Sequence, residues 1–106
     1  MVERFDVYLV NLDDEVSKNP RNTRPCVIIS PDEMNRNITN VIIAPLSSAT
    51  AKYPTRVAVN FLNSERMMVL DQLRAVDKER LVKKVGEIDR AVRKTIIDRL
   101  QEMFAE

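Results

Sequence analysis

Two short apolar runs, PCVIIS at residues 25–30 and VIIAPL at residues 41–46, decide the fold of this chain. Apolar side chains follow one another in each run, so both faces of an extended segment would be apolar. This pattern is typical of central strands that are covered on both sides. We therefore expect the two runs to form the middle of a β-sheet.

The neighbouring segments supply further strands. Apolar and polar side chains alternate over residues 5–10 (FDVYLV) and again over residues 55–60 (TRVAVN), which is the two-residue period of a strand. Residues 67–73 (MMVLDQL) are a further expected strand after a polar turn at residues 63–66. The polar stretch at residues 13–23 is expected to be a long loop.

The end of the chain has a helical period. Val92, Ile96 and Leu100 recur at helical spacing, with Met103 or Phe104 next in the series. Asp89 is a good N-cap, so the pattern predicts an amphipathic helix over residues 90–104. Residues 77–88 fit either a short helix or a strand.

These elements together predict a mainly β fold, in which a small, curved antiparallel sheet carries a C-terminal helix. Residues 1–106 are expected to form one domain. The chain has a single glycine, Gly86. Tight hairpin turns normally need glycine, so we expect longer turns that use Asn and Pro.

The composition excludes several kinds of active site. The 106 residues include 17 Lys and Arg, 16 Asp and Glu, one Cys and no His. A structural zinc site, a histidine acid–base pair and a Cys–His nucleophile therefore have no residues to build them. The balanced charge argues against binding nucleic acid by bulk electrostatics. No apolar run approaches the roughly 20 residues of a membrane helix, and no signal-peptide pattern is present, so we expect a cytoplasmic protein.

Several motifs in series carry a resemblance to a known family. They are RFDVY at residues 4–8, RPCVIIS at 24–30, VIIAPLSS at 41–48, YPT at 53–55 and LDQLRAVDKERL at 70–81. In sequence, order and spacing, and over most of the chain, they resemble the MazF/PemK toxins.

The resemblance implies a small SH3-like β-barrel with a terminal helix, which pairs as a homodimer in the bacterial cytoplasm. Members of the family are sequence-specific endoribonucleases that cut single-stranded RNA without a metal ion or other cofactor. A cognate antitoxin of the MazE kind inhibits them. We expect its disordered C-terminal tail to fold onto the dimer and cover the RNA groove.

The resemblance also implies roles for individual residues. Arg24 matches the family's catalytic arginine, and Ser47 stands where the family has its catalytic Thr or Ser. Gln72 falls in the DQ[IL]R segment beside the substrate groove. Ser48 could replace Ser47, but alternation along a strand would let only one of the two serines share a face with Arg24, and the alignment favours Ser47.

Two further residues are candidate substrate contacts, and one position departs from the family. Asn19 belongs to a loop that borders the RNA groove in the family, although this loop lacks the family's glycine. Tyr53, which precedes Pro54 in a loop, could stack on a base. The family's first motif usually reads RGDVY, and here Phe5 replaces the glycine.

RNA chemistry suits a chain without histidine. The 2′-hydroxyl can attack the neighbouring phosphate, which leaves a 2′,3′-cyclic phosphate and a 5′-hydroxyl and needs no protein nucleophile. The enzyme must align the reacting atoms and stabilise charge on the phosphorane. Arg24 can fork two N–H donors onto the phosphate oxygens, and the Ser47 hydroxyl can add a third.

Other interpretations of these residues remain open. An Arg before a strand is often part of a surface ion pair, and serines at a strand end often form turns. Cys26 is expected to be a buried small apolar residue rather than a reactive thiol. Two other functions are compatible with the fold, namely a non-catalytic toxin of the CcdB kind, or an RNA-binding module that does not cut.

Overall fold

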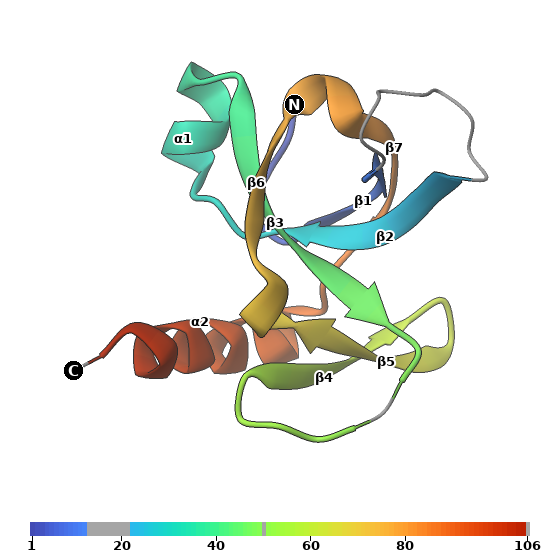
Figure 1. Ribbon diagram of the computed structural model, residues 1–106, viewed down its shortest axis with the longest axis vertical. Helices are drawn as coiled ribbons and strands as arrows, with labels where there is room; N and C mark the ends of the chain where they lie inside the picture. The colour runs from blue at the N-terminus through green and yellow to red at the C-terminus, as the bar shows by residue number, and fades with distance from the viewer. Residues whose placement is uncertain (13–21, 50, 106) are drawn as a thin grey trace.

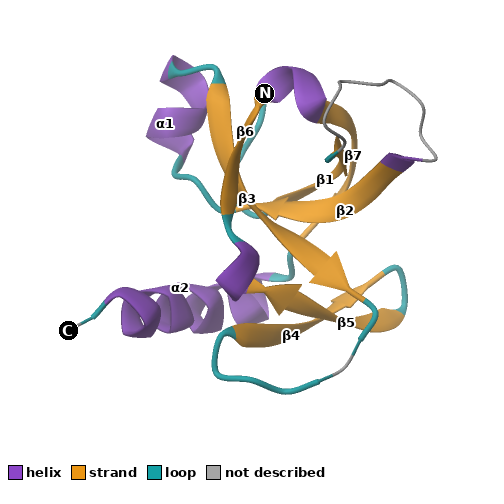
Figure 2. Cartoon of the chain, viewed as in Figure 1, coloured by secondary structure: helices purple, strands orange, loops and turns teal. Residues whose placement is uncertain are grey.

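The computed structural model describes residues 1–12, 22–49 and 51–105. These residues form a curled antiparallel sheet, and the C-terminal helix packs against its lower part (Figures 1 and 2). The mainly β fold predicted from the sequence is confirmed. The strands are β1 (Asp6–Asn11), β2 (Thr23–Ile28), β3 (Asn40–Ser47), β4 (Arg56–Phe61), β5 (Ser64–Val69), β6 (Arg74–Asp77) and β7 (Leu81–Glu87). The helices are α1 (Asp32–Asn37) and α2 (Arg90–Phe104), with 3-10 turns η2 (Leu70–Gln72) and η3 (Lys78–Arg80).

Strand β3 changes its partner halfway along its length, and this makes the sheet curl. Its first half pairs with β6, from Asn40 opposite Asp77 to Ile43 opposite Arg74. Its last two residues pair with β5 instead. On its other edge β3 pairs with β2, so the strand order is β4-β5-β3-β2-β1-β7, with β6 beside β3. The two expected central strands therefore lie in the middle of the sheet.

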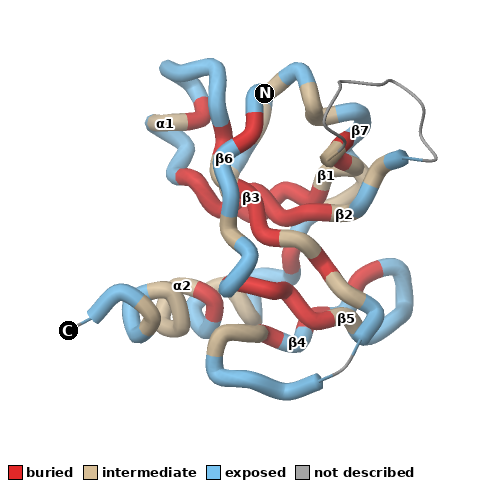
Figure 3. The backbone as a smooth tube through the Cα atoms, in the orientation of Figure 1, coloured by how far each residue is buried: buried red, intermediate tan, exposed pale blue. Residues whose placement is uncertain are grey.

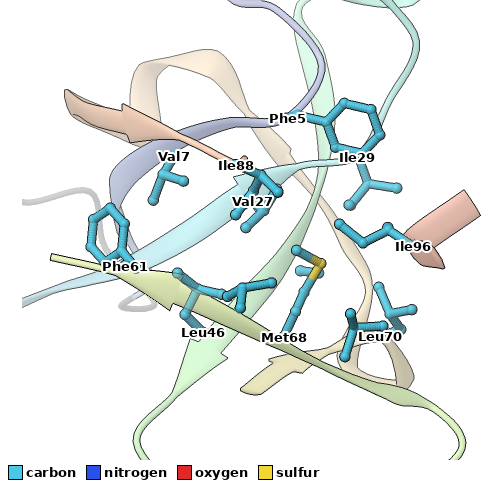
Figure 4. Close-up of a cluster of buried hydrophobic side chains, with 13 residues drawn as sticks. Phe5, Val7, Val27, Ile29, Leu46, Phe61, Met68, Leu70, Ile88 and Ile96 are labelled. Carbon is cyan, nitrogen blue, oxygen red and sulfur yellow. The ribbon is translucent and has the colours of Figure 1, made fainter. Parts of the chain in front are cut away.

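Much of the two central strands is buried, as the red stretches in Figure 3 show. Val27 points into the larger core, while its neighbours Cys26 and Ile28 point into the smaller one. Helix α2 contributes Ile96 to the larger core, where it is fully buried and lies near Ile29, Met68 and Leu70 (Figure 4). This burial explains why residues 25–29 and 41–46 are apolar.

Helix α2 has the predicted bounds, and its start is capped as expected. The Asp89 carboxylate accepts a hydrogen bond from the Ala91 N–H at 3.1 Å. Among the described residues no helix is long and apolar enough to cross a membrane. The open choice for residues 77–88 is settled as the short turn η3 followed by strand β7, which pairs with β1.

The turn between β4 and β5 corrects two expectations. Residues 63–66 are not a long polar turn, because Phe61 pairs with Ser64 and only Leu62 and Asn63 lie between the strands. Both have left-handed backbones, with φ of 51° and 60°. This is the geometry of a tight primed turn, here made without glycine, so the expectation of longer turns is wrong at this position.

Other boundaries also differ from the sequence pattern. The strand expected at residues 67–73 ends at Val69, and residues Leu70–Gln72 form η2. The pattern did not predict α1 or β6, which have only six and four residues. Of the loop expected at residues 13–23, residues 13–21 lie outside the described part, and Thr23 already belongs to β2.

Phe5 has a left-handed backbone, with φ of 73°, at the position where the family usually has glycine. This conformation costs a non-glycine residue about 1–2 kcal/mol. The Phe5 N–H donates to Ile28 and its carbonyl accepts from Ile88, so the backbone is held on both sides. Its ring is buried in the larger core, with Arg4 and Arg93 over it at 5.7 and 5.2 Å. Burying the ring offsets the backbone cost.

We expect Leu62→Asn to stabilise the fold. The Leu62 side chain is 71% exposed and its loss removes little burial, whereas Asn tolerates a left-handed backbone. The free energy of unfolding in urea should rise by about 1 kcal/mol.

Ile38→Asn is the matched control, because Ile38 is also half exposed but has an ordinary φ of −127°. It should give no increase. If Leu62→Asn were no more stable than Ile38→Asn, the turn would not be strained in the way its backbone angles indicate.

Candidate active site

Strands β2, β3, β4 and β5 and the turn η2 surround one polar pocket of about 370 Å³. Its lining combines three arginines, two serines, a glutamine and three apolar side chains: Arg24, Arg56, Arg66, Ser47, Ser48, Gln72, Pro45, Leu46 and Val69. The structure therefore brings together four of the residues singled out in the sequence, namely Arg24, Ser47, Ser48 and Gln72. The described lining contains no acidic side chain.

Strands β2 and β3 bring Arg24 and Ser47 to the same pocket. Cys26 lies opposite Pro45 in this antiparallel pair. This is the last pair of the ladder toward the pocket. Arg24 comes two residues before Cys26, and Ser47 comes two residues after Pro45, so each continues the face of its own strand. Both side chains line the pocket.

The Ser47 hydroxyl is oriented by the end of its own strand. Its Oγ accepts a hydrogen bond from the Ala49 N–H at 3.1 Å. Because this contact occupies a lone pair, the hydroxyl proton stays available to donate to a ligand. Ser48 lies just beyond β3, so strand alternation no longer applies to it and both serines line the pocket with Arg24. The expectation that only one serine could do so is wrong.

Gln72 reaches the pocket from η2, which is anchored at its start. The Leu70 side chain is fully buried, and its N–H donates to the Thr55 carbonyl at 3.0 Å. Gln72 itself is exposed. The buried Leu70 fixes the backbone of η2, and the exposed Gln72 amide beside it is therefore well placed to contact a ligand.

Sequence reasoning missed Arg56, which is braced from two sides. Its Nε lies 3.5 Å from Oδ1 of Asp71, and its guanidinium lies 4.8 Å from the centre of the Tyr53 ring. The same Asp71 oxygen accepts from the Thr55 hydroxyl at 2.9 Å. Tyr53 does not line the pocket; it supports a residue that does.

The Asp71 carboxylate is held in its charged form. Burial raises the pKa of Asp71, but hydrogen bonds from Thr55, from its own backbone and from Arg56 outweigh that effect and lower the pKa below its ordinary value. Asp71 therefore stays ionised and keeps the Arg56 guanidinium in place.

Arg66, on β5, was missed as well. Its Nε is buried and has no hydrogen-bond partner among the described residues, and none of those residues forms an ion pair with it. Leaving a buried donor unpaired costs about 1–3 kcal/mol. The sequence pattern predicts a polar turn at residues 63–66, where an arginine is ordinary, so no sequence signal separates Arg66 from a surface residue.

The remaining candidates lie elsewhere. Asn19 falls outside the described residues. Cys26 is fully buried, and burial raises the pKa of its thiol to about 12, which agrees with the prediction of an inert apolar residue. In residues 1–12, 22–49 and 51–105, no three His, Cys, Asp or Glu side chains gather into a group that could hold a metal ion.

Comparison with solved structures identifies the same fold. The chain resembles an endoribonuclease in complex with its cognate antitoxin from mycobacterial species, with a TM-score of 0.81, 22% identity, and coverage of 96% of this chain and 93% of the other. It also resembles MazF in a MazE–MazF complex from Deinococcus radiodurans, with a TM-score of 0.79, 18% identity, and coverage of 98% and 95%.

Sequence comparison identifies the family. Endoribonuclease EndoA of Bacillus subtilis (strain 168) is 29% identical over 99% of this chain and 96% of its own length. Endoribonuclease MazF of Staphylococcus epidermidis is 34% identical over 80% of this chain and 76% of its own length. A family model described as the PemK-like, MazF-like toxin of type II toxin–antitoxin systems matches residues 3–104. The chain therefore belongs to the PemK/MazF-like family of type II toxins.

Proposed function

We propose that this chain is a sequence-specific endoribonuclease toxin that cuts single-stranded RNA, messenger RNA included, without a metal ion. The observation that carries the proposal is the pocket in which Arg24, Ser47, Ser48 and Gln72 meet. The names of the relatives, both endoribonucleases, support the same activity.

The pocket's charge suits an RNA backbone. Three arginines face a cavity whose described lining has no carboxylate, so an anion is favoured there. The volume of about 370 Å³ is at the small end of the range for small-molecule sites, which fits about one nucleotide. Single-stranded RNA can enter such a pocket with its bases splayed, as sequence-specific RNA recognition usually requires.

The reaction we propose is attack by the RNA's own 2′-oxygen. The 2′-hydroxyl gives up its proton as its oxygen bonds to phosphorus. The bond from phosphorus to the 5′-oxygen of the next nucleotide breaks, and that 5′-oxygen takes up a proton, so the reaction consumes and releases no net proton. The products are a 2′,3′-cyclic phosphate and a 5′-hydroxyl, so no protein nucleophile takes part.

Arg24 and Ser47 share the stabilisation of the phosphorane. A guanidinium group stays protonated at physiological pH, so Arg24 acts as a charge stabiliser and hydrogen-bond donor and not as a base. Its fork suits two non-bridging phosphate oxygens. The Ser47 hydroxyl donates a hydrogen bond to the same group, while its oxygen accepts from the Ala49 N–H.

The substrate contacts we propose surround these two residues. Ser48 and Gln72 line the pocket and offer both donors and acceptors to a base edge. Tyr53 is 57% exposed, so a base can stack on its ring beyond the face that Arg56 covers. Asn19 is proposed from the resemblance alone, as part of the loop that borders the groove in the family.

Substitutions in the pocket test this chemistry. Arg24→Ala should lose at least about 10²–10³ in cleavage rate, or roughly 3–4 kcal/mol, because a preorganised donor is removed. Arg24→Lys should recover little, since the fork is gone. Ser47→Ala should lose less, and Ser47→Thr should stay active. All four should fold, as judged by circular dichroism.

The same assay tests the metal and the products. EDTA should leave wild-type cleavage unchanged, and mass spectrometry should find a cyclic phosphate on the upstream fragment. Full activity of Arg24→Ala, or cleavage lost in EDTA and restored by Mg²⁺, would show that the chemistry lies elsewhere. Binding of RNA without any products would indicate a module that does not cut.

We also propose that the chain works as a homodimer that a cognate antitoxin inhibits. Large apolar side chains remain exposed on a single copy, including Phe104 at 73% and Val82 at 38%. One similar solved structure is an endoribonuclease in complex with its cognate antitoxin, and another is a MazE–MazF complex. A disordered antitoxin tail, acidic and apolar in composition, is suited to cover a pocket lined by arginines.

Sedimentation at micromolar concentration should give about 24 kDa, twice the 12.2 kDa of one chain. Adding the antitoxin tail should stop cleavage, because it occupies the RNA site. A 12 kDa monomer would contradict the dimer. Cleavage that persists in the saturated complex would contradict inhibition at the RNA site.

A further inference from the structure

The pocket holds more positive charge than one phosphodiester can neutralise. A scissile phosphate carries a single negative charge, and in the proposed reaction Arg24 and Ser47 already serve it. Arg56 and Arg66 line the same cavity and have no part in that reaction. Their presence needs a ligand group beyond the scissile phosphate.

The Nε–H group of Arg66 is a hydrogen-bond donor without an acceptor among the described residues. Its Nε is shielded from solvent and donates to no described residue. Buried donors in native proteins are nearly always paired, so an unpaired one beside a cavity points to an acceptor that the ligand supplies. None of the described carboxylates forms an ion pair with Arg66, so its charge is also free for that ligand.

Arg56 is preorganised for the same purpose. Its Nε pairs with the Asp71 carboxylate, and its guanidinium lies over the Tyr53 ring. Its two terminal nitrogens make no hydrogen bond to any described residue. A guanidinium fixed at its inner edge and open at its outer edge can bind an anion with little loss of side-chain entropy.

We propose that Arg56 and Arg66 form a second phosphate site, which holds a phosphodiester next to the scissile one in single-stranded RNA. This inference rests on the proposed function. Both side chains offer donors only, which matches phosphate oxygens. The other common partner of an arginine fork is the O6 and N7 edge of guanine, and the experiment below separates the two.

The site binds and positions the RNA, and the bond-breaking step belongs to Arg24 and Ser47. Loss of either arginine should therefore raise Kd and KM and change kcat little. Each lost phosphate contact should also lower the slope of log Kd against log salt concentration by about 0.7.

The test uses a fluorescent RNA that contains the site cut by the wild-type chain, with a 2′-deoxy residue at that site to prevent cleavage. Arg66→Met and Arg56→Met should each weaken binding about ten- to a hundredfold. Arg36→Met is the matched control, because it removes the same charge from an exposed position on α1. It should leave Kd and the salt slope almost unchanged.

A methylphosphonate, which removes the charge of one phosphate, identifies the partner. Placed at one phosphate adjacent to the scissile one, it should weaken wild-type binding and make no further difference to Arg66→Met. Coupling of Arg66 to a 7-deazaguanine substitution instead would show base recognition and overturn the inference. Absence of coupling at every adjacent phosphate would overturn it as well.

Two variants guard against misfolding. Arg66→Lys keeps the charge and should retain part of the affinity, and Arg56→Met leaves the half-buried Arg66 untouched. If the wild type cuts RNA and Arg24→Ala does not, while both Met variants behave like Arg36→Met, the proposed function stands and this inference fails. If the wild type neither binds nor cuts RNA, both fail.

Discussion

The change of partner along β3 is the constraint on which the rest of the structure depends. The strand starts beside β6 and ends beside β5, while β2 stays on its other edge. Pro45 lies where the partner changes, and a proline has no N–H to offer a ladder. The curl that results brings β4 and β5 against the end of β3, so that side chains from four strands line one pocket.

Burial on both faces of the sheet makes that geometry rigid. Val27 and Cys26, adjacent in β2, point into different cores. Arg24 follows the same alternation and is therefore placed by packing further along its strand. The left-handed backbone at Phe5 is also held by packing, because the Phe5 ring is buried in the larger core. The positions of the charged side chains in the pocket are thus fixed by the packing of the apolar cores.

The sequence predicted the strands and the C-terminal helix better than the pocket. Continuous apolar runs identified β2 and β3, and Asp89 with its helical period identified α2, because long, regular patterns report burial directly. The turn at Leu62 and Asn63 was mispredicted, since pairing between β4 and β5 imposes on Leu62 a left-handed backbone that leucine does not favour alone.

The pocket itself was predicted only in part. Arg24 and Ser47 were found through a resemblance, because neither residue is unusual in its own strand. Arg56 and Arg66 were missed, since alternation tells which side chains share a face of one strand and not which strands a curled sheet brings together. The braced pair of Arg56 and Asp71 joins the start of β4 to η2, a contact between distant parts of the chain that no local pattern reports.

A crystal structure of the chain with an RNA that has a 2′-deoxy residue at the cleavage site tests the central claim most directly. The account predicts that the scissile phosphate lies within hydrogen-bond distance of both the Arg24 guanidinium and the Ser47 hydroxyl. An RNA bound with its scissile phosphate away from both residues, for example along α2, would contradict it.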